Sequence, residues 1–239
     1  MDHGFEPFGV VHALLLAGFL AGIAPVVRLG RRQREDAAGA RRTGRLAALG
    51  IVAVTVPFQL IDFLPGRFDL DTTLPINLCD LAWMAAAYAL WTHRHYPSAL
   101  TYYWGLVLTT QGLLTPSLSH DFPDLRFFAF WGLHFLVVWS AIYLTWGLGI
   151  RPTWRGYTAT VVTTAVWAVV VFGFNLVADT NYGYLNHKPH TASLLDLLGP
   201  WPLYVGLEIA IVAVVWALMT WPWIRGTNAA PLSADPTPS

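Results

Sequence analysis

The sequence contains little charge. Of its 239 residues, 12% are Asp, Glu, Lys or Arg, whereas soluble domains carry about 25%. The 14 basic and 14 acidic residues balance one another, so no concentrated positive surface indicates nucleic-acid binding. The composition therefore excludes an ordinary soluble domain and a nucleic-acid-binding protein.

Several residue types are also scarce. Cys79 is the single cysteine, which excludes a disulfide within the chain. Lys188 is the single lysine and lies outside the long apolar runs, so no membrane span offers the Schiff-base lysine of a retinal photoreceptor. Zinc-binding signatures such as H-E-x-x-H are absent, and His187 and His190, which are three residues apart, match none of them. We therefore expect neither a metal nor a cofactor.

Apolar residues are abundant: 55% of the chain is hydrophobic, and the mean hydropathy is +0.49. Residues 1–9 contain no Lys or Arg, unlike the start of a cleaved signal peptide, so the first apolar run is expected to remain as a span. Windows of about 19 residues predict an all-α, polytopic membrane protein. Its seven spans are predicted near residues 9–27, 45–63, 74–92, 98–115, 126–148, 155–177 and 201–223.

The fourth span is the weakest of the seven, because it is short, contains Thr101 and Gln111, and ends at Pro116. A six-span arrangement is the alternative. Residues 1–225 are expected to form one transmembrane domain. Residues 226–239 are rich in Pro, Ser, Ala and Thr, a composition that predicts a disordered tail.

Basic residues predict the orientation of the spans. Eleven of the fourteen Lys and Arg residues fall on one side of the seven-span arrangement, and seven of them lie in the segment 28–45. Since short cytoplasmic loops carry the excess of Lys and Arg, this segment is predicted to be an Arg-rich cytoplasmic loop. The N-terminus is then outside and the C-terminus inside.

Polar side chains within the predicted spans gather in the outer half of the membrane. Such groups are costly in hydrocarbon and are expected to face the bundle interior. Their common depth predicts a polar pocket near the outer face, although hydrogen bonds between helices are the alternative explanation. The residues are His12, Gln59, Asp62, Asn77, Cys79, Asp80, Gln111, His134, Asn175 and Glu208.

Cys79 and His134 form the candidate catalytic pair. A cysteine thiolate is a nucleophile that needs a base to form it, and His134 is an intramembrane histidine at similar depth. Asp80 or Glu208 is a candidate to orient the imidazole, although an ionised Asp80 would disfavour the neighbouring thiolate. Cysteine is also a common core residue, and that interpretation stays open.

Other polar residues are candidates for substrate binding. Asn77 and Gln111 are candidate donors to an oxyanion, and Asn175 and Glu208 lie at similar depth. The stretch that begins at Asn181 and Tyr182 is rich in aromatic residues and proline. It is predicted to lie at the membrane interface and cover the pocket. Pro75 is a favourable first-turn residue and predicts the start of the third helix.

Several motifs carry a family resemblance. They are Leu-Pro-Ile-Asn-Leu-Cys-Asp at 74–80, Leu-Thr-Pro at 114–116, Phe122-Pro123 with His134, and the block from Asn181 to Pro202. Together they resemble the YwaF-type integral membrane proteins of bacteria, which implies a bacterial cytoplasmic membrane. A more distant similarity extends to eukaryotic multispan acyltransferases that remodel ether phospholipids with a cysteine and a histidine, and to intramembrane hydrolases that use threonine and histidine. That similarity implies Cys79 as the acyl-accepting nucleophile and His134 as its base.

The expected function is therefore a lipid acyltransferase or acyl hydrolase whose partners are membrane lipids. The main alternative is a transporter or receptor that binds a small polar ligand or a lipid headgroup in the same pocket. A structural partner without pocket chemistry is the third interpretation. The sequence does not predict an oligomeric state.

Overall fold

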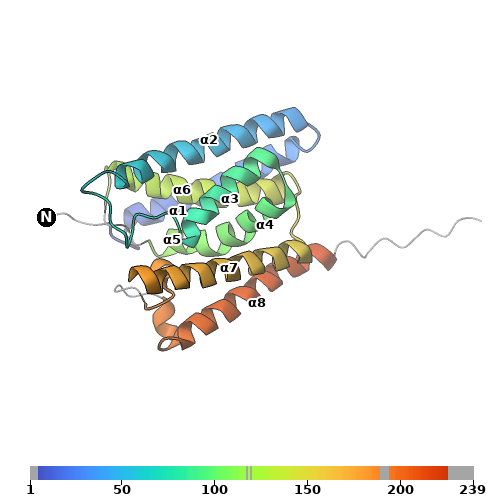
Figure 1. The fold of residues 1–239 in the computed structure, drawn as a ribbon. Coiled ribbons are helices and arrows are strands. Elements are labelled where there is room, and N and C mark those ends of the chain that lie inside the picture. The colour runs from blue at the N-terminus through green and yellow to red at the C-terminus, as the bar shows by residue number, and fades with distance from the viewer. Residues whose placement is uncertain (1–4, 117, 119, 189–193, 226–239) are drawn as a thin grey trace, which may run out of the picture.

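The computed structural model describes residues 5–116, 118, 120–188 and 194–225. These residues form helices joined by short loops, so the predicted all-α class is confirmed. Figure 1 shows the helices running side by side along one common direction. His190 and the predicted disordered tail, 226–239, lie outside the described residues. The elements are α1 (Val10–Arg32), α2 (Ala37–Asp62), α3 (Leu78–Thr92), α4 (His95–Tyr103), η1 (Trp104–Thr109), α5 (Thr110–Leu114), α6 (Leu125–Ile142), η2 (Tyr143–Gly147), α7 (Trp154–Ala178), η3 (Tyr182–Tyr184), η4 (Leu194–Leu198) and α8 (Leu203–Arg225).

Five helical segments in the described chain are long and apolar enough to cross a membrane. The protein is therefore a polytopic membrane protein. The five candidates are Val10–Arg32, Ala37–Asp62, Leu125–Gly147, Trp154–Ala178 and Leu203–Ile224.

The third and fourth predicted spans form helices that differ from the other five. Helix α3 has 15 residues, which is shorter than the roughly 20 that a span needs. The fourth segment runs from α4 through the π-helical η1 into the five-residue α5. Helix α3 packs against α2, α6 and the fourth segment, and the fourth segment also packs against α6 and α7. The number of seven crossings stays a prediction.

Helix α3 begins later than Pro75 suggested, so that prediction is wrong. Asn77 is the N-cap, with extended backbone angles, and Leu78 is the first helical residue. The backbone N–H of Asn77 donates to Asp80 Oδ2 at 3.1 Å, as in a capping box. Asp80, three residues after Asn77, thus stabilises the start of the helix at Leu78. Cys79 consequently lies in the first turn of α3.

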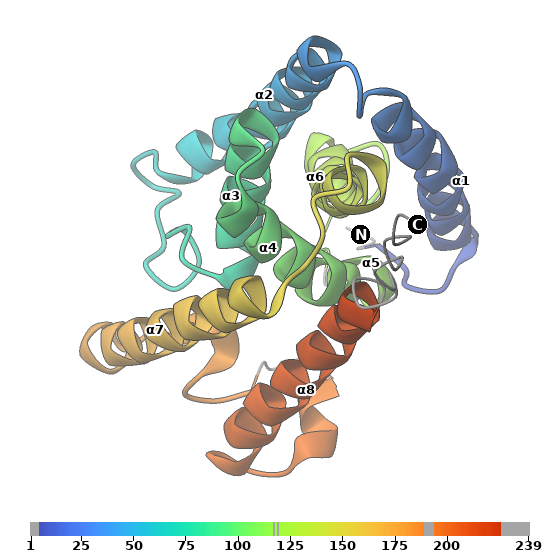
Figure 2. The same ribbon diagram turned by 90° about the vertical axis from the view of Figure 1, so that its right-hand side faces the viewer.

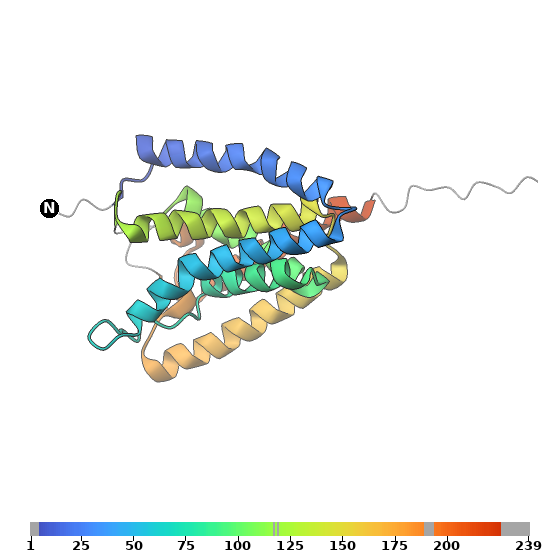
Figure 3. The ribbon, with the colours of Figure 1, turned by 90° about the horizontal axis from the view of Figure 1, so that it is seen from above.

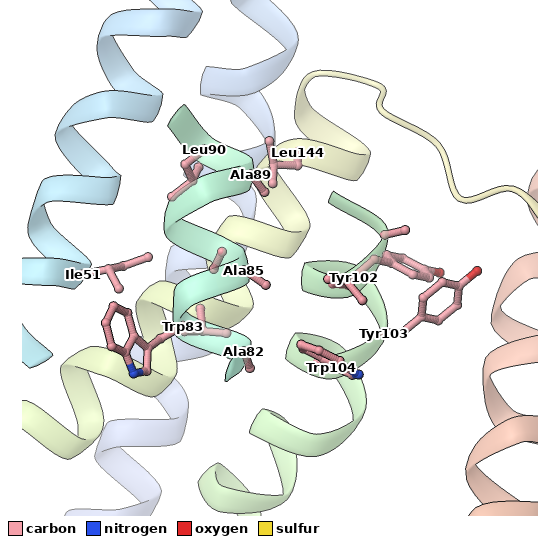
Figure 4. Close-up of a cluster of buried hydrophobic side chains, with 14 of the residues drawn as sticks. Ile51, Ala82, Trp83, Ala85, Ala89, Leu90, Tyr102, Tyr103, Trp104 and Leu144 are labelled. Atoms are coloured by element: carbon pink, nitrogen blue, oxygen red, sulfur yellow. The ribbon is translucent and has the colours of Figure 1, made fainter. Parts of the chain in front are cut away.

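Alanine residues let α3 pack closely at the centre of the bundle. Ala82, Ala86 and Ala89 are fully buried, and small side chains allow neighbouring helices to approach closely within a membrane. Figure 4 shows alanines of α3 beside Leu144 and beside aromatic residues of α4 and η1. The largest buried cluster of the described chain is built around this helix.

The outer helices are arranged unevenly around this centre. Helix α1 packs against α6 and η2, and Figure 3 shows α1 and α7 on opposite sides of the bundle. Figure 2 shows α7 and α8 diverging from one another on the side away from α1 and α2. This divergence positions the cavity described below.

Glycines join α1 to the end of α6 and η2. A Cβ atom built on Gly30 would lie 2.5 Å from the Cα of Gly147, so the two backbones are in direct contact. Arg34 strengthens this end of the interface, because its Nε donates to the carbonyl of Gly147 at 2.7 Å and its Nη2 to that of Trp146 at 3.0 Å. The guanidinium thereby satisfies helix-terminal carbonyls that lack a helical partner.

The Gly30→Ala variant is expected to be destabilised. The added methyl group forces α1 away from η2, and such overpacking costs about 1–3 kcal/mol. Gly18→Ala in the same helix is the matched control, because nothing lies within 4 Å of a Cβ at that position. The measurement is the thermal unfolding midpoint of each variant in detergent. Equal midpoints for the two variants would show that the Gly30–Gly147 contact does not hold α1 in place.

Candidate functional site

A cavity of about 460 Å³ lies where α7 and α8 diverge, beside the first turn of α3. Apolar side chains of α7 and α8 form much of its lining, and polar side chains from four elements line it as well. The polar lining residues include Asn77, Cys79, Asp80, Gln111, Thr164 and Glu208. Clefts of this size and mixed lining are typical of ligand sites.

Hydrogen bonds hold the middle and the C-terminal part of α8 against the rest of the bundle. Tyr103 Oη and Thr220 Oγ1 are 2.7 Å apart, and Tyr102 donates to the carbonyl of Met219 at 3.2 Å. Tyr157 of α7 donates to the carbonyl of Ala213 at 3.3 Å. These bonds join α8 to α4 and α7.

The segment between α7 and α8 holds the N-terminal end of α8. Tyr204 Oη donates to the carbonyl of Tyr184, and Trp201 Nε1 donates to that of Leu185 at 3.0 Å. Trp167 of α7, which lines the cavity, donates to the carbonyl of Ile76 at 2.7 Å. Helix α8 is thus held at several points along its length, and the cavity lies beside residues 205–216 of this helix.

Cys79 is exposed and lines this cavity. It is the second residue of α3, and the N-terminal turn of a helix favours negative charge. Asp80 lines the cavity beside it, with its carboxylate held by the Asn77 N–H. Asn77 Oδ1 in turn accepts a hydrogen bond from the Gly183 N–H at 3.1 Å, so this residue joins α3 to the outer loop.

Gln111 and Glu208 line the cavity from α5 and α8. Within the part of the chain that the structure describes, neither side chain has a hydrogen-bond partner. Both are therefore free to bind a ligand. With Asn77, Cys79 and Asp80 they bring five of the nine predicted site residues to one cavity.

His134 lies outside the cavity lining, behind α5. It is 9% exposed, and its Nδ1 is 2.7 Å from the carbonyl oxygen of Phe130. A carbonyl only accepts, so Nδ1 carries the proton and Nε2 keeps its lone pair. Nε2 faces α5 at Gly112, where a Cβ atom would lie only 2.6 Å from it. No hydrogen bond joins His134 to Cys79 within the described residues.

Asn175 organises the loop that follows α7. Its amide is 1% exposed and makes four hydrogen bonds, donating to the Tyr182 carbonyl and to Asn186 and accepting from the Tyr182 N–H and from Thr180, at distances of 2.9–3.1 Å. This is the full capacity of an amide side chain. Asn175 does not line the cavity.

Asn181 and Tyr182 also fix the loop rather than line the cavity. The Asn181 side chain bonds to the ring and carbonyl of His187. Tyr182 Oη accepts from the Leu74 N–H and donates to the Leu70 carbonyl. Burial raises the pKa of Tyr182, so this hydroxyl stays protonated and keeps the bond to Leu70.

Three other polar residues of the predicted outer cluster connect helices or loops. His12 Nε2 is 2.8 Å from the Leu113 carbonyl, Gln59 donates to the Thr73 carbonyl, and Asp62 pairs with Arg126 at 2.6 Å. For these residues the hydrogen-bonding interpretation is confirmed.

Thr164 and Trp216 line the cavity without having been predicted. Thr164 accepts a hydrogen bond from Trp104 Nε1. Threonine and tryptophan are common in membrane helices, so neither residue stands out in the sequence. Among the described residues, no three His, Cys, Asp or Glu side chains lie close enough together to bind a metal ion.

Comparison with known proteins supplies the family. A family model described as the TMEM164 family matches residues 7–220. The search of curated proteins and the search of solved structures each find no match.

The family match corrects two expectations from the sequence. The assignment to the YwaF-type bacterial proteins is wrong, because the model that matches nearly the whole bundle is a different one. The short motifs that led to the YwaF assignment lie mainly at the capped start of α3 and in the loop after α7. These are structural features and do not define one family. Without that assignment a bacterial cytoplasmic membrane has no support, and the supported location is a multi-pass position in a membrane.

The Asn175→Ala variant is expected to loosen the loop after α7. It removes all four amide bonds and leaves buried backbone groups unpaired, at a cost of about 1–3 kcal/mol for each unsatisfied group. Hydrogen–deuterium exchange should therefore accelerate at the Tyr182 and Gly183 amides. Asn186→Ala, which removes one of the four bonds, is the matched control and should have a smaller effect. Unchanged exchange in Asn175→Ala would contradict its role in the loop.

Proposed function

We propose that this chain, which belongs to the TMEM164 family, transfers or hydrolyses a lipid acyl group, with Cys79 as the nucleophile. One observation carries the proposal. The only thiol of the chain is exposed in a cavity that is lined by both polar groups and hydrocarbon side chains.

The lining favours a lipid ester as the substrate. Val161, Ala165 and Ala168 of α7 face the cavity together with Val205, Ile209 and Val212 of α8. An acyl chain fits between these walls, since its burial there needs no hydrogen bonds. The ester at the head of the chain would then lie beside Cys79 and its polar neighbours Asn77 and Asp80.

The first turn of α3 supports the nucleophile. A thiolate at the second helical position lies near the positive end of the helix dipole. The neighbouring Asp80 carboxylate is engaged by the Asn77 N–H, which offsets part of its repulsion of a thiolate. The unpaired backbone N–H groups of this turn and the Gln111 amide are the candidate donors to an oxyanion.

His134 is the base in this proposal. Its Nδ1–H bond to Phe130 leaves Nε2 as a proton acceptor, and Gly112 lets Nε2 approach α5 next to the cavity-lining Gln111. Catalytic hydrogen bonds often become short only when substrate is bound. We therefore expect the proton of Cys79 to reach Nε2 through water in the substrate complex, because α5 lies between the two side chains.

The reaction proceeds in two steps. The thiolate attacks the ester carbonyl, the bond between the carbonyl carbon and the alcohol oxygen breaks, and His134 returns the proton to the departing lysolipid hydroxyl. A thioester on Cys79 remains. The hydroxyl of a second lipid, or water, then attacks this thioester while His134 accepts its proton, and the thiol of Cys79 is restored.

The second candidate is a non-catalytic receptor or carrier. It is favoured by the Glu208 carboxylate, which lines the cavity from α8, together with Asp80 on the other side. Two carboxylates suit a cationic headgroup such as an ammonium. In this case Cys79 is a lining residue without chemistry.

Labelled acyl lipid presented to the full chain in nanodiscs separates the two candidates. Wild type should form a hydroxylamine-sensitive acyl adduct, and Cys79→Ala should form none. His134→Gln should slow both formation and breakdown of the adduct by about 10²–10⁴-fold, since general base catalysis contributes this much. Lipid binding should survive in both variants.

Ser140→Ala is the control, because this buried side chain bonds only to the carbonyl of Leu136 and lies outside the cavity. Its rate should equal that of wild type. Transfer at the wild-type rate by Cys79→Ala would overturn the catalytic proposal. Binding that Glu208→Gln abolishes, without any acyl adduct in wild type, would establish the receptor or carrier instead.

A further inference from the structure

A second cavity, of about 450 Å³, lies at the opposite end of the bundle from Cys79. It is formed by the N-terminal turns of α4 and α7 and by the segment that joins η2 to α7. It shares no lining residue with the Cys79 cavity. This end also carries the junction of α1 and α2 (Figure 1), and Arg31, Arg32, Arg34, Arg41 and Arg42 lie within a few residues of it in the sequence.

The charge of this second cavity is one-sided. Arg151, Arg155 and His95 line it, and no Asp or Glu does. Within the described residues neither arginine forms an ion pair. Two unpaired guanidinium groups in one cavity are a strong attraction for a phosphate, which they can bind through paired N–H donors.

Both helix ends at the cavity add to this attraction. Neither α4 nor α7 has an acidic residue in its first turn, so the positive end of each helix dipole lacks a local counter-charge. The N-terminal turn of α4 has no side-chain cap, and its first N–H groups have no partner inside the helix. These groups are suited to an anion, as helix N-termini commonly are.

A groove continues from the cavity along the outside of α7. Tyr96, Arg155 and Ala159 line both the cavity and the groove, which extends over Thr158, Val162 and Thr163. Tyr96 Oη and Thr163 Oγ1 are 2.7 Å apart, so α4 and α7 are joined beside it. Val162 is 55% exposed, as expected for a side chain that faces lipid.

We propose that this cavity and groove form a binding site for one anionic phospholipid. Its phosphate lies between Arg151 and Arg155 at the N-terminal turns of α4 and α7, and an acyl chain follows the groove past Ala159 and Val162. The continuity of the basic cavity with an apolar groove favours a phospholipid over a soluble phosphate ester. The lipid belongs to the leaflet at the Arg-rich end, where basic residues meet anionic headgroups. This site is independent of the proposed acyl transfer.

The test uses the full chain purified in a neutral detergent and matched lipids with identical acyl chains. Phosphatidylglycerol should bind wild type in native mass spectrometry and raise its thermal midpoint, whereas phosphatidylcholine should do neither. Arg151→Gln with Arg155→Gln should weaken phosphatidylglycerol binding by at least about tenfold. Arg32→Gln with Arg42→Gln removes the same charge at the same end outside the cavity, and should bind as wild type does.

Two further measurements distinguish a phospholipid from a soluble phosphate compound as the ligand. Ala159→Leu narrows the junction of cavity and groove and should weaken phosphatidylglycerol while leaving inorganic phosphate and glycerol 3-phosphate unaffected. A midpoint shift with glycerol 3-phosphate equal to that with phosphatidylglycerol, and insensitive to Ala159→Leu, would overturn the lipid assignment. If the double arginine variant does not fold, the wild-type comparison decides, since equal binding of the two phospholipids overturns the proposal.

Discussion

Hydrocarbon offers no hydrogen bonds, and this single constraint governs where the polar groups of the bundle lie. A side chain such as Asn175 is tolerated only because its four hydrogen bonds are made inside the protein. Gln111 and Glu208 lack such bonds and instead face a cavity. The same physical requirement thus separates the residues that build the scaffold from those that are available to a ligand.

Hydrogen bonds hold α8 near its N-terminus, at Ala213 and at Met219 and Thr220, and the cavity lies beside residues 205–216 of this helix. Aromatic hydroxyl and indole groups make most of these connections, as with Tyr103 and Thr220 at one end and Trp201 and Leu185 at the other. Such side chains carry one polar group on a large apolar body. They can therefore join helices within a membrane at little cost, and the apolar interval between them remains open to lipid.

The sequence was sufficient for the fold class, because hydropathy is a local property of the chain. It was insufficient for the start of α3, since Pro75 is a plausible first residue and the reciprocal bond between Asn77 and Asp80 became apparent only in three dimensions. The structural use of Asn175 and Tyr182 could not be predicted either, because it depends on a loop whose path the apolar pattern does not specify. Likewise, the relation of His134 to Gly112 depends on which face of α5 meets α6.

The π-helical segment η1 determines that last relation. A wider turn accommodates an additional residue, and the side-chain hydroxyls of Thr109 and Thr110 donate to the carbonyls of Trp104 and Gly105, five residues earlier. The phase of α5 relative to α4 is therefore offset by about one residue, roughly 100°. Two consecutive residues consequently face different parts of the structure. Gln111 lines the cavity, and Gly112 lies against the imidazole of His134. In a regular α-helix Gln111 and Gly112 would face other directions. The π-helical turn therefore determines which residues of α5 lie between Cys79 and His134.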